Sequence, residues 1–91
     1  MKLKWTDEAV SDLSRLYDFL APTNPKAGAR IVQSLVKKTG LLPHHPRIGE
    51  KLERYAPREI RRILIGLYEV RYEVDDSVIH ILRIWHARED R

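Results

Sequence analysis

The side chains of this sequence that can move protons or hold a phosphate group are arginines, glutamates and a histidine near its C-terminal end. Together they supply a base, an acid and a positive clamp, which is what RNA cleavage requires because the 2′-hydroxyl is an internal nucleophile. They are Arg61, Arg62, Arg71, Arg83, Arg88 and Arg91, with Glu59, Glu69 and His86. Whether any of them meet depends on the strands that carry them.

Glu69, Arg71 and Glu73 alternate with apolar residues, so an extended strand would place all three on one side. On a solvated sheet face such residues form cross-strand ion pairs, and this structural interpretation fits the pattern better than a catalytic one. Tyr68 and Tyr72 alternate with valines on the other side. That arrangement indicates a buried strand face rather than a surface for base stacking.

Metal and cofactor sites are not expected. His80 and His86 lie on the same side of one predicted strand, but about 3.3 Å per residue places them roughly 20 Å apart, too far for one ion. His44 and His45 are adjacent in a proline-flanked segment without a carboxylate at ligand spacing. The sequence has no cysteine and no Gly-x-Ser-x-Gly turn, and its four scattered glycines cannot build a phosphate-binding loop.

The composition describes one small, basic domain. The 91 residues carry a formal net charge of +4, which favours polyanionic partners such as nucleic acid or an acidic protein. The absence of cysteine fits a reducing cytoplasm. No apolar run approaches the roughly 18 residues of a membrane span, and the first residues lack the apolar stretch of a signal peptide. We therefore expect a cytoplasmic protein that is not bound to a membrane.

The first part of the chain predicts a short strand and a helix. Residues 2–5 alternate as an edge strand does, and Thr6 after them suits the N-cap of a helix that Pro22 ends. One predicted helical face is apolar and comprises Val10, Leu13, Leu16, Tyr17 and Leu20. The polar residues placed elsewhere on this helix are Asp12, Arg15 and Asp18.

A second helix follows after a short gap. Asn24 suits its N-cap and Pro25 its first position, where the missing N–H has no helical partner to lose. Its apolar stripe comprises Ile31, Val32, Leu35 and Val36, and Gly40 marks its exit. Because so few residues separate the helices, we expect an antiparallel helical hairpin.

The remainder predicts a loop over residues 43–57 and then three strands. The strands are residues 59–65, 68–74 and 78–86, with turns at Gly66 and at Asp75-Asp76-Ser77. Turns this short join antiparallel neighbours, so the strands should form a meander, with the doubly apolar last strand in a central position. The helical hairpin is the available cover for one face. We therefore predict a single two-layer α+β domain, in the order β-α-α-β-β-β, with the hairpin packed on an antiparallel sheet.

Several short motifs occur along the chain in a characteristic order. They are Trp5-Thr6-Asp7-Glu8-Ala9, Asn24-Pro25, Pro46-x-x-Gly49, Arg58-Glu59-Ile60-Arg61, Tyr68-Glu69-Val70-Arg71-Tyr72 and Ile81-Leu82-Arg83-Ile84-Trp85-His86-Ala87-Arg88. With these motifs the chain resembles, over nearly its whole length, the RelE/ParE superfamily of type II toxin–antitoxin toxins. It looks most like the ParE branch.

The resemblance implies a small cytoplasmic bacterial toxin held inactive by an antitoxin that is encoded beside it. Antitoxins of this group wrap an extended or helical C-terminal segment around the toxin, and a basic toxin suits an acidic, partly disordered binder. RelE-like members cut messenger RNA on the ribosome. ParE-like members poison DNA gyrase.

The nuclease pattern is incomplete in this chain. RelE-like nucleases carry an arginine early in the corresponding strand, in a pattern like Tyr-Arg-x-x-Tyr, where this chain has Glu69. Arg71 lies on the same face but is displaced by about 7 Å. The nucleases also often have a late tyrosine as acid–base, whereas here His86 stands without any tyrosine after Tyr72. The resemblance therefore favours the ParE-like activity.

From the resemblance we expect a non-enzymatic inhibitor of DNA gyrase that forms a hetero-oligomer with a cognate antitoxin and does not bind nucleic acid sequence-specifically. The expected target-binding residues are Arg58, Arg61, Arg62, Arg88 and Arg91. The expected antitoxin-binding residues, beside a sheet edge and the helical hairpin, are Leu13, Leu16, Tyr17 and Leu20, although core packing explains most of these.

Two alternatives stay open. One is a ribosome-dependent messenger RNA endonuclease that uses Arg61, Arg71, His86 and Arg88 as its catalytic set. The other is an antitoxin-binding module without toxic activity.

Overall fold

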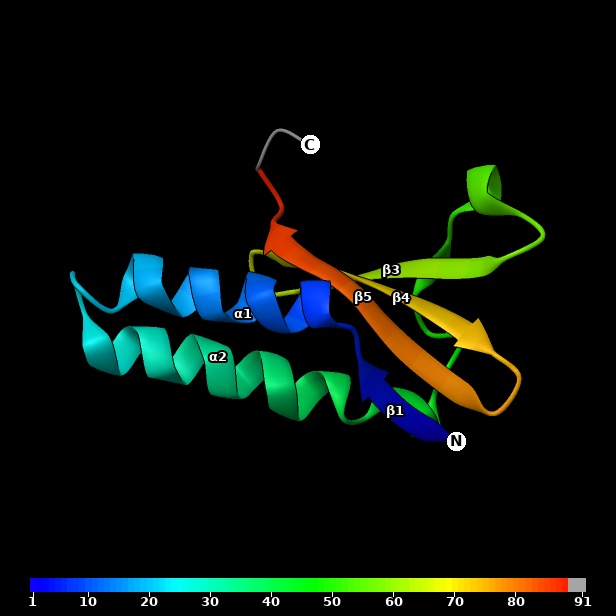
Figure 1. Cartoon of the computed structure of the whole chain (residues 1–91), viewed down its shortest axis with the longest axis horizontal. Coiled ribbons are helices and arrows are strands. Elements are labelled where there is room, and N and C mark those ends of the chain that lie inside the picture. The colour runs from blue at the N-terminus through cyan, green and yellow to red at the C-terminus, as the bar shows by residue number, and fades with distance from the viewer. Residues whose placement is uncertain (89–91) are drawn as a thin grey trace.

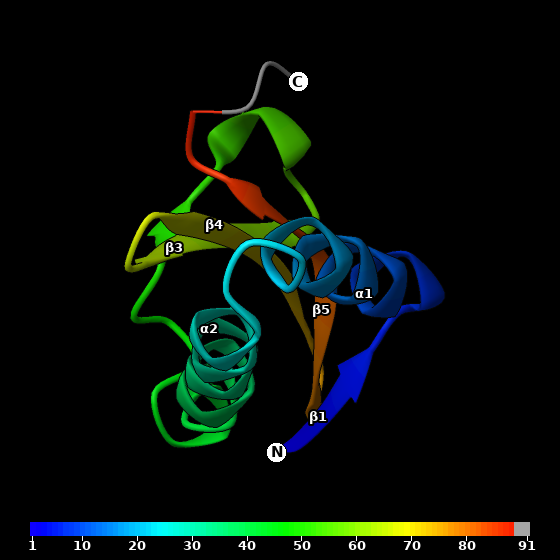
Figure 2. The same ribbon diagram turned by 90° about the vertical axis from the view of Figure 1, so that its left-hand side faces the viewer.

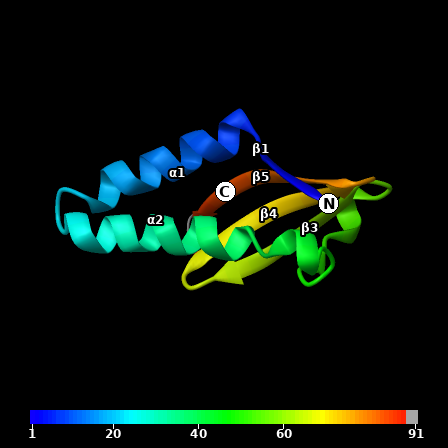
Figure 3. The same cartoon turned by 90° about the horizontal axis from the view of Figure 1, so that it is seen from below.

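The computed structural model describes residues 1–88 and shows two helices packed on one face of a five-stranded sheet (Figure 1). Seen from below, the helical hairpin lies along the sheet and its α1–α2 turn projects beyond the strands (Figure 3). The helices are α1 (Asp7–Leu20) and α2 (Pro25–Thr39), with 3₁₀ turns η1 (Leu42–His44) and η2 (Glu53–Tyr55). The strands are β1 (Lys2–Trp5), β2 (Glu50–Lys51), β3 (Glu59–Ile65), β4 (Tyr68–Asp75) and β5 (Val78–His86). The predicted two-layer α+β fold is confirmed.

The strand order is β1-β5-β4-β3-β2, and every neighbouring pair is antiparallel except β1 and β5. The predicted meander of β3, β4 and β5 is confirmed, as is the central position of β5. Two features were not expected. The opening strand β1 pairs with β5 in parallel, and the predicted loop contains the two-residue strand β2, which pairs with β3.

Both predicted helix caps are present. The Thr6 hydroxyl oxygen accepts a hydrogen bond from the Ala9 N–H at 3.1 Å and also donates to the Ile81 carbonyl at 3.0 Å, which ties the start of α1 to β5. The Asn24 side chain accepts from the Ala27 N–H at 3.1 Å, and Pro25 opens α2. These caps satisfy backbone N–H groups that have no partner inside their own helices.

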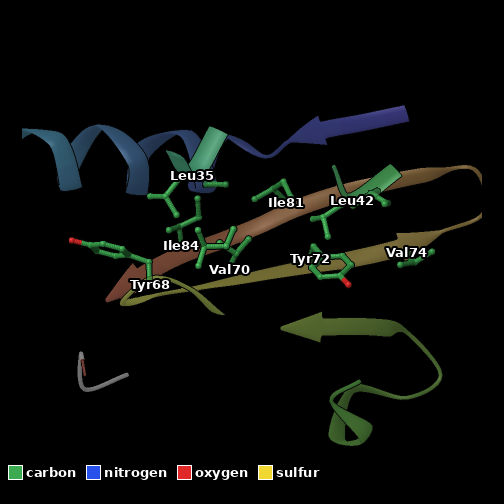
Figure 4. Packing of buried hydrophobic residues seen from close by; sticks show 11 residues of the cluster. Leu35, Leu42, Tyr68, Val70, Tyr72, Val74, Ile81 and Ile84 are labelled. Atoms are coloured by element: carbon green, nitrogen blue, oxygen red, sulfur yellow. The ribbon is translucent and has the colours of Figure 1, made fainter. Parts of the chain in front are cut away.

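The core lies between the helices and the sheet and is drawn in Figure 4. Its buried members from β4 are Tyr68, Val70, Tyr72 and Val74, joined by Leu35 and Leu42 from the helical side and by Ile79, Ile81 and Ile84 of β5. The alternation of β4 thus marks the buried face as predicted.

Tyr72 also holds the loop before β2. Its hydroxyl donates to the Pro46 carbonyl and accepts from the Gly49 N–H, each at 2.9 Å. A Cβ atom at position 49 would lie only 2.6 Å from the Arg62 carbonyl oxygen and 2.7 Å from the Tyr72 hydroxyl. The Pro46-x-x-Gly49 motif therefore brings a backbone without a side chain against the sheet.

The buried face of α1 differs from the predicted one. Val10 is 53% exposed and Tyr17 is 38% exposed, whereas Asp12, expected on the polar side, is buried. The buried carboxylate is tolerated because its oxygens accept hydrogen bonds from Arg83 and from the Ile84 N–H of β5. The prediction from helical periodicity assigned aspartate to the solvent side. The predicted apolar face is therefore rotated about the helix axis relative to the observed buried face.

Candidate functional site

The register of β3 and β4 decides which arginines share a face. Arg62 lies opposite Arg71, whereas Arg61 lies opposite Tyr72. Residues directly opposite in an antiparallel pair point to the same side. Arg62 and Arg71 therefore occupy the sheet face away from the helices, and Arg61 points to the side on which Tyr72 is buried.

A buried carboxylate organises the face away from the helices. Glu69 is 1% exposed and accepts hydrogen bonds from Arg62 at 3.1 Å and from Arg71 at 2.9 Å. Arg62 also donates to Glu50 at 2.7 Å, and this carboxylate raises the pKa of the guanidinium. The predicted ion pairs on this face are therefore present, but Glu69 lies beneath its partners rather than in solvent.

Aromatic rings extend this network at both ends. Arg71 donates to the Tyr55 hydroxyl at 3.0 Å and lies 5.0 Å from the centre of the Trp85 ring, over which Arg83 also lies. Arg54 stacks on Tyr55, with its guanidinium carbon 4.9 Å from the ring centre. The hydrogen bond with Arg54 and the nearby charge of Arg71 lower the pKa of the Tyr55 phenol.

These residues form a small polar hollow. A cavity of about 320 Å³ is lined by Glu50, Leu52, Arg54, Arg62 and Arg71. A ring of guanidinium groups suits a phosphate or carboxylate ligand. Glu69 already offsets the charge of two of the three arginines, so an incoming anion competes with a built-in one.

His86 lies away from this hollow. It sits opposite Tyr68 on the helix-facing side of the sheet, and the two rings make an edge-to-face contact at 5.4 Å. Its Nδ1 accepts a hydrogen bond from the Arg88 N–H at 3.1 Å. The four residues of the nuclease alternative, Arg61, Arg71, His86 and Arg88, are therefore not brought together around one point.

The expected target-binding arginines differ in accessibility. Arg58 and Arg62 have side chains that are 58% and 38% exposed, and Arg88 is also exposed. Arg61 is mostly covered, because its guanidinium donates to Glu59 at 2.8 Å and to the Gly49 carbonyl at 2.7 Å. Arg91 lies outside the residues that the structure describes.

The expected antitoxin-binding residues lie along α1. Leu13 and Leu16 are half-buried against the core, Leu20 is also half-buried, and Tyr17 reaches solvent. A largely apolar cavity of about 320 Å³ lies beside this helix, with Leu16, Phe19, Tyr68, Ile84 and Trp85 in its lining. Phe19, which is 80% exposed at this cavity, falls outside the predicted stripe and was missed.

Neither a metal site nor a membrane span is found in residues 1–88. No group of three or more histidine, cysteine or acidic side chains in this range could hold an ion. The helices in the same range are too short and too polar to cross a bilayer.

Comparison with known proteins gives a consistent result. Residues 3–91 match the family described as the ParE toxin of the type II toxin–antitoxin system parDE. Two curated relatives come from Caulobacter vibrioides. Toxin RelE2 is 32% identical over 83 residues, with 91% of each chain covered, and Toxin RelE1 is 34% identical over 85 residues, with 91% of this chain and 89% of the relative covered.

Two solved structures share the fold. A chain of the chromosomal ParDE toxin–antitoxin system from P. aeruginosa has a TM-score of 0.80 and 27% identity, over 94% of this chain and 95% of that chain. A chain of the toxin–antitoxin complex RelBE2 from Mycobacterium tuberculosis has a TM-score of 0.61 and 28% identity, over 93% and 95%. The chain therefore belongs to the ParE toxin family of type II toxin–antitoxin systems, within the RelE/ParE superfamily.

Proposed function

We propose that this toxin inhibits DNA gyrase by protein–protein binding, without a chemical step of its own, and that a cognate antitoxin neutralises it in a hetero-oligomer. The observation that carries the proposal is the placement of Arg61 and Arg71 on opposite faces of the sheet. A nuclease that used both would need them around one phosphate group. Because gyrase acts in the cytoplasm, we also propose a cytoplasmic location for this toxin.

Glu69 supports the same proposal. Its buried carboxylate holds Arg62 and Arg71 from beneath, at the place where a nuclease would bind the phosphate with a free positive charge. A carboxylate repels the scissile phosphate and draws both guanidinium groups toward itself. This face is therefore better suited to a stable protein surface than to transition-state stabilisation.

For gyrase we propose contacts through exposed arginines that are distributed along the sheet, from the start of β3 to the end of β5. Arg58 and Arg62 reach solvent from the β3 side, and Arg88 follows β5. Arg91 is proposed to add to this surface. Arg61 would contribute indirectly. Its guanidinium donates to both Glu59 and the Gly49 carbonyl, and so holds the loop before β2 against β3.

For the antitoxin we propose a contact along α1. Tyr17 is exposed, and Leu16 lines the apolar cavity beside Phe19. Leu13 and Leu20 would form the floor of this contact, since both are already half-buried in the free toxin. Both solved relatives come from toxin–antitoxin systems, which supports a partner of this kind.

The endonuclease alternative is favoured by one observation. The two curated relatives from Caulobacter vibrioides are both named RelE toxins. In this reading Arg71 and its arginine neighbours would bind messenger RNA, and His86 or Arg88 would have to approach from the end of β5.

Two assays with the purified toxin separate these functions. One measures supercoiling of relaxed plasmid by gyrase, and the other measures cleavage of messenger RNA in a translating extract. We expect supercoiling to stop while the message stays intact. The control is the toxin bound to its antitoxin, which should leave both activities unchanged.

Other results would decide against the proposal. Cut messenger RNA with normal supercoiling would identify the endonuclease. A toxin that binds its antitoxin but leaves both assays unaffected would be an antitoxin-binding module without toxic activity.

A further inference from the structure

The apolar cavity beside α1 lies at the end of β5 that β1 does not reach. Strand β1 pairs with β5 only as far as Ile81, so side chains of α1 lie beside Ile84, Trp85 and His86. Figure 2 looks at the hairpin from its α1–α2 turn and shows the end of β5 beside α1 and above α2. We call this space the α1–β5 cavity. Its volume of about 320 Å³ falls within the range of small-molecule sites, about 300–1,000 Å³.

Three aromatic rings line the α1–β5 cavity, and two of them are held in place. Tyr68 makes its edge-to-face contact with His86 at 5.4 Å, and the guanidinium group of Arg83 lies 5.5 Å from the centre of the Trp85 ring. The third ring, Phe19, is 80% exposed at the cavity. Exposed aromatic surface gains by being covered, and aromatic rings favour stacked or edge-to-face partners. The walls therefore suit a flat aromatic ligand.

The charged groups of the cavity favour an anion. The titratable side chains in its lining are Asp12, Arg15, Tyr68 and His86. Asp12 is 3% exposed, and its oxygens accept hydrogen bonds from Arg83 and from the Ile84 N–H, so its charge is compensated inside the fold. Arg15 reaches this carboxylate at 3.4 Å, and its side chain is 60% exposed. The positive charge of Arg15 is therefore available to a ligand in the cavity.

His86 adds a hydrogen-bond donor to this charge. Its Nδ1 accepts the Arg88 N–H at 3.1 Å, so the neutral ring carries its proton on Nε2. An imidazole in this tautomer donates to a ligand oxygen. A carboxylate can accept hydrogen bonds from both Nε2 and the Arg15 guanidinium, whereas an ammonium group would be repelled by the arginine.

We propose that the α1–β5 cavity binds a small aromatic carboxylate. The ring of the ligand lies between Phe19 and the fixed rings of Tyr68 and Trp85. Its carboxylate accepts hydrogen bonds from Arg15 and His86. This site rests on the cavity, the rings and the charge, and it is independent of the target of the toxin. Because Phe19 also lies in the proposed antitoxin contact, the ligand should compete with the antitoxin, and this consequence alone rests on the proposed function.

Titration of the purified toxin with naphthalene-2-carboxylate tests the site, with the backbone amide NMR signals as the readout. The neutral probe naphthalene-2-carboxamide has the same rings without the charge. We expect saturable shifts at Phe19, Ile84 and His86, with a Kd of about 1 mM or below for the carboxylate and at least about fivefold weaker binding of the carboxamide. Shifts that do not saturate, that map to other residues, or that show equal affinity for both probes overturn the inference.

A matched pair of arginine variants tests the role of charge. Arg15→Gln should weaken binding of the carboxylate at least about fivefold and leave that of the carboxamide within about twofold. Arg30→Gln, the same change at an exposed position of α2, should leave the affinity for both probes unchanged. A carboxylate affinity that does not respond to Arg15→Gln, or that falls equally in both variants, would contradict the proposed orientation of the ligand.

A second pair of variants tests the contact with the exposed ring. Phe19→Ala should weaken binding of both probes, whereas Leu41→Ala, which removes an exposed apolar side chain outside this cavity, should weaken neither. The two side chains are 80% and 59% exposed, so both variants should fold. Equal affinities of Phe19→Ala and wild type would show that the ligand does not lie against this ring.

The same titration of the purified toxin–antitoxin complex tests the competition. Loss of carboxylate binding in the complex would support it. Binding that persists in the complex would refute the antitoxin contact at this cavity and would leave the ligand site itself intact.

Discussion

Asp12 of α1 and Arg83 of β5 form a two-point ion pair across the layers of the fold, with oxygen–nitrogen distances of 2.7 and 3.1 Å. The same carboxylate accepts the buried Ile84 N–H at 2.9 Å, at a stretch of β5 that β1 no longer covers. The Asp12 side chain thus accepts a hydrogen bond from β5 that a neighbouring strand would otherwise accept, just beyond the point where β1 ends. The pair fixes α1 against the last strand.

Asp12→Ala should therefore destabilise the toxin. Arg83 is half exposed and can regain water, but the Ile84 N–H would be left buried without its acceptor, at a cost of about 1–3 kcal/mol. Urea unfolding should show this as a fall in the free energy of unfolding. Asp18→Ala, at an exposed position of the same helix, is the control and should change it by less than about 0.5 kcal/mol. Equal effects of the two substitutions would contradict the role of Asp12.

Glu69→Gln should expose a latent anion site. Glutamine removes the negative charge that holds Arg62 and Arg71, which leaves three arginines around the polar hollow with Glu50 as the remaining carboxylate of its lining. We expect the variant to bind a short single-stranded RNA in fluorescence anisotropy, with an affinity that falls as salt rises. Glu73→Gln, on the same strand face, is the matched control and should bind no more RNA than wild type. An unchanged anisotropy for Glu69→Gln would show that Glu69 does not control anion binding here.

The ion pair of Arg58 with Glu73 should make stability depend on pH. The hydrogen bond from Arg58 lowers the pKa of the Glu73 carboxyl in the folded state. A carboxyl with a lowered pKa adds stability above its unfolded pKa, about 4.3, and loses that contribution as the pH falls through the folded value.

Urea unfolding between pH 7 and pH 3 should therefore show a decline below about pH 4.3 that is shallower in Glu73→Gln than in wild type. Glu59 has a pKa lowered by its hydrogen bond with Arg61 and will still contribute to the decline in the variant. Identical slopes for both proteins would mean that the Arg58–Glu73 pair is not formed in solution.

Arg58→Ala should weaken gyrase inhibition with little loss of stability. The Arg58 side chain is largely exposed, and solvent screens an exposed ion pair, so the loss of this pair should change the stability of the fold only slightly. If it contacts gyrase, about tenfold more variant than wild type should be needed for half inhibition of supercoiling. Arg30→Ala, an exposed arginine on α2, serves as the control for net charge. A variant as potent as wild type would remove Arg58 from the contact surface.

Much of the fold could be predicted from local patterns. The caps at Thr6 and Asn24, the turn at Gly66 and the buried alternation of β4 depend on neighbouring residues and are all present. The burial of Asp12 could not be predicted in this way, since its partner Arg83 lies 71 positions along the chain. The parallel pairing of β1 with β5 is likewise a long-range contact that short alternation does not specify.

The separation of Arg61 from Arg71 had a usable signal in the sequence. A two-residue connection at Gly66-Leu67 places Ile65 opposite Tyr68, and counting back from this pair puts Arg62 opposite Arg71. The predicted nuclease set combines Arg61 with Arg71, although this register places the two side chains on opposite faces of the sheet. The positions of Arg54 and Tyr55 had no such signal, because they depend on how η2 folds over the sheet.

The uneven charge of the helical hairpin has a kinetic consequence. Helix α1 carries Asp7, Glu8, Asp12 and Asp18 against Arg15, while α2 carries only basic charges. The two helices lie side by side, so the hairpin is negative along one flank and positive along the other (Figure 1). The electric field orients an acidic chain toward the α2 flank while it diffuses toward the toxin. Its association rate constant should therefore fall with ionic strength more steeply than its dissociation rate constant rises.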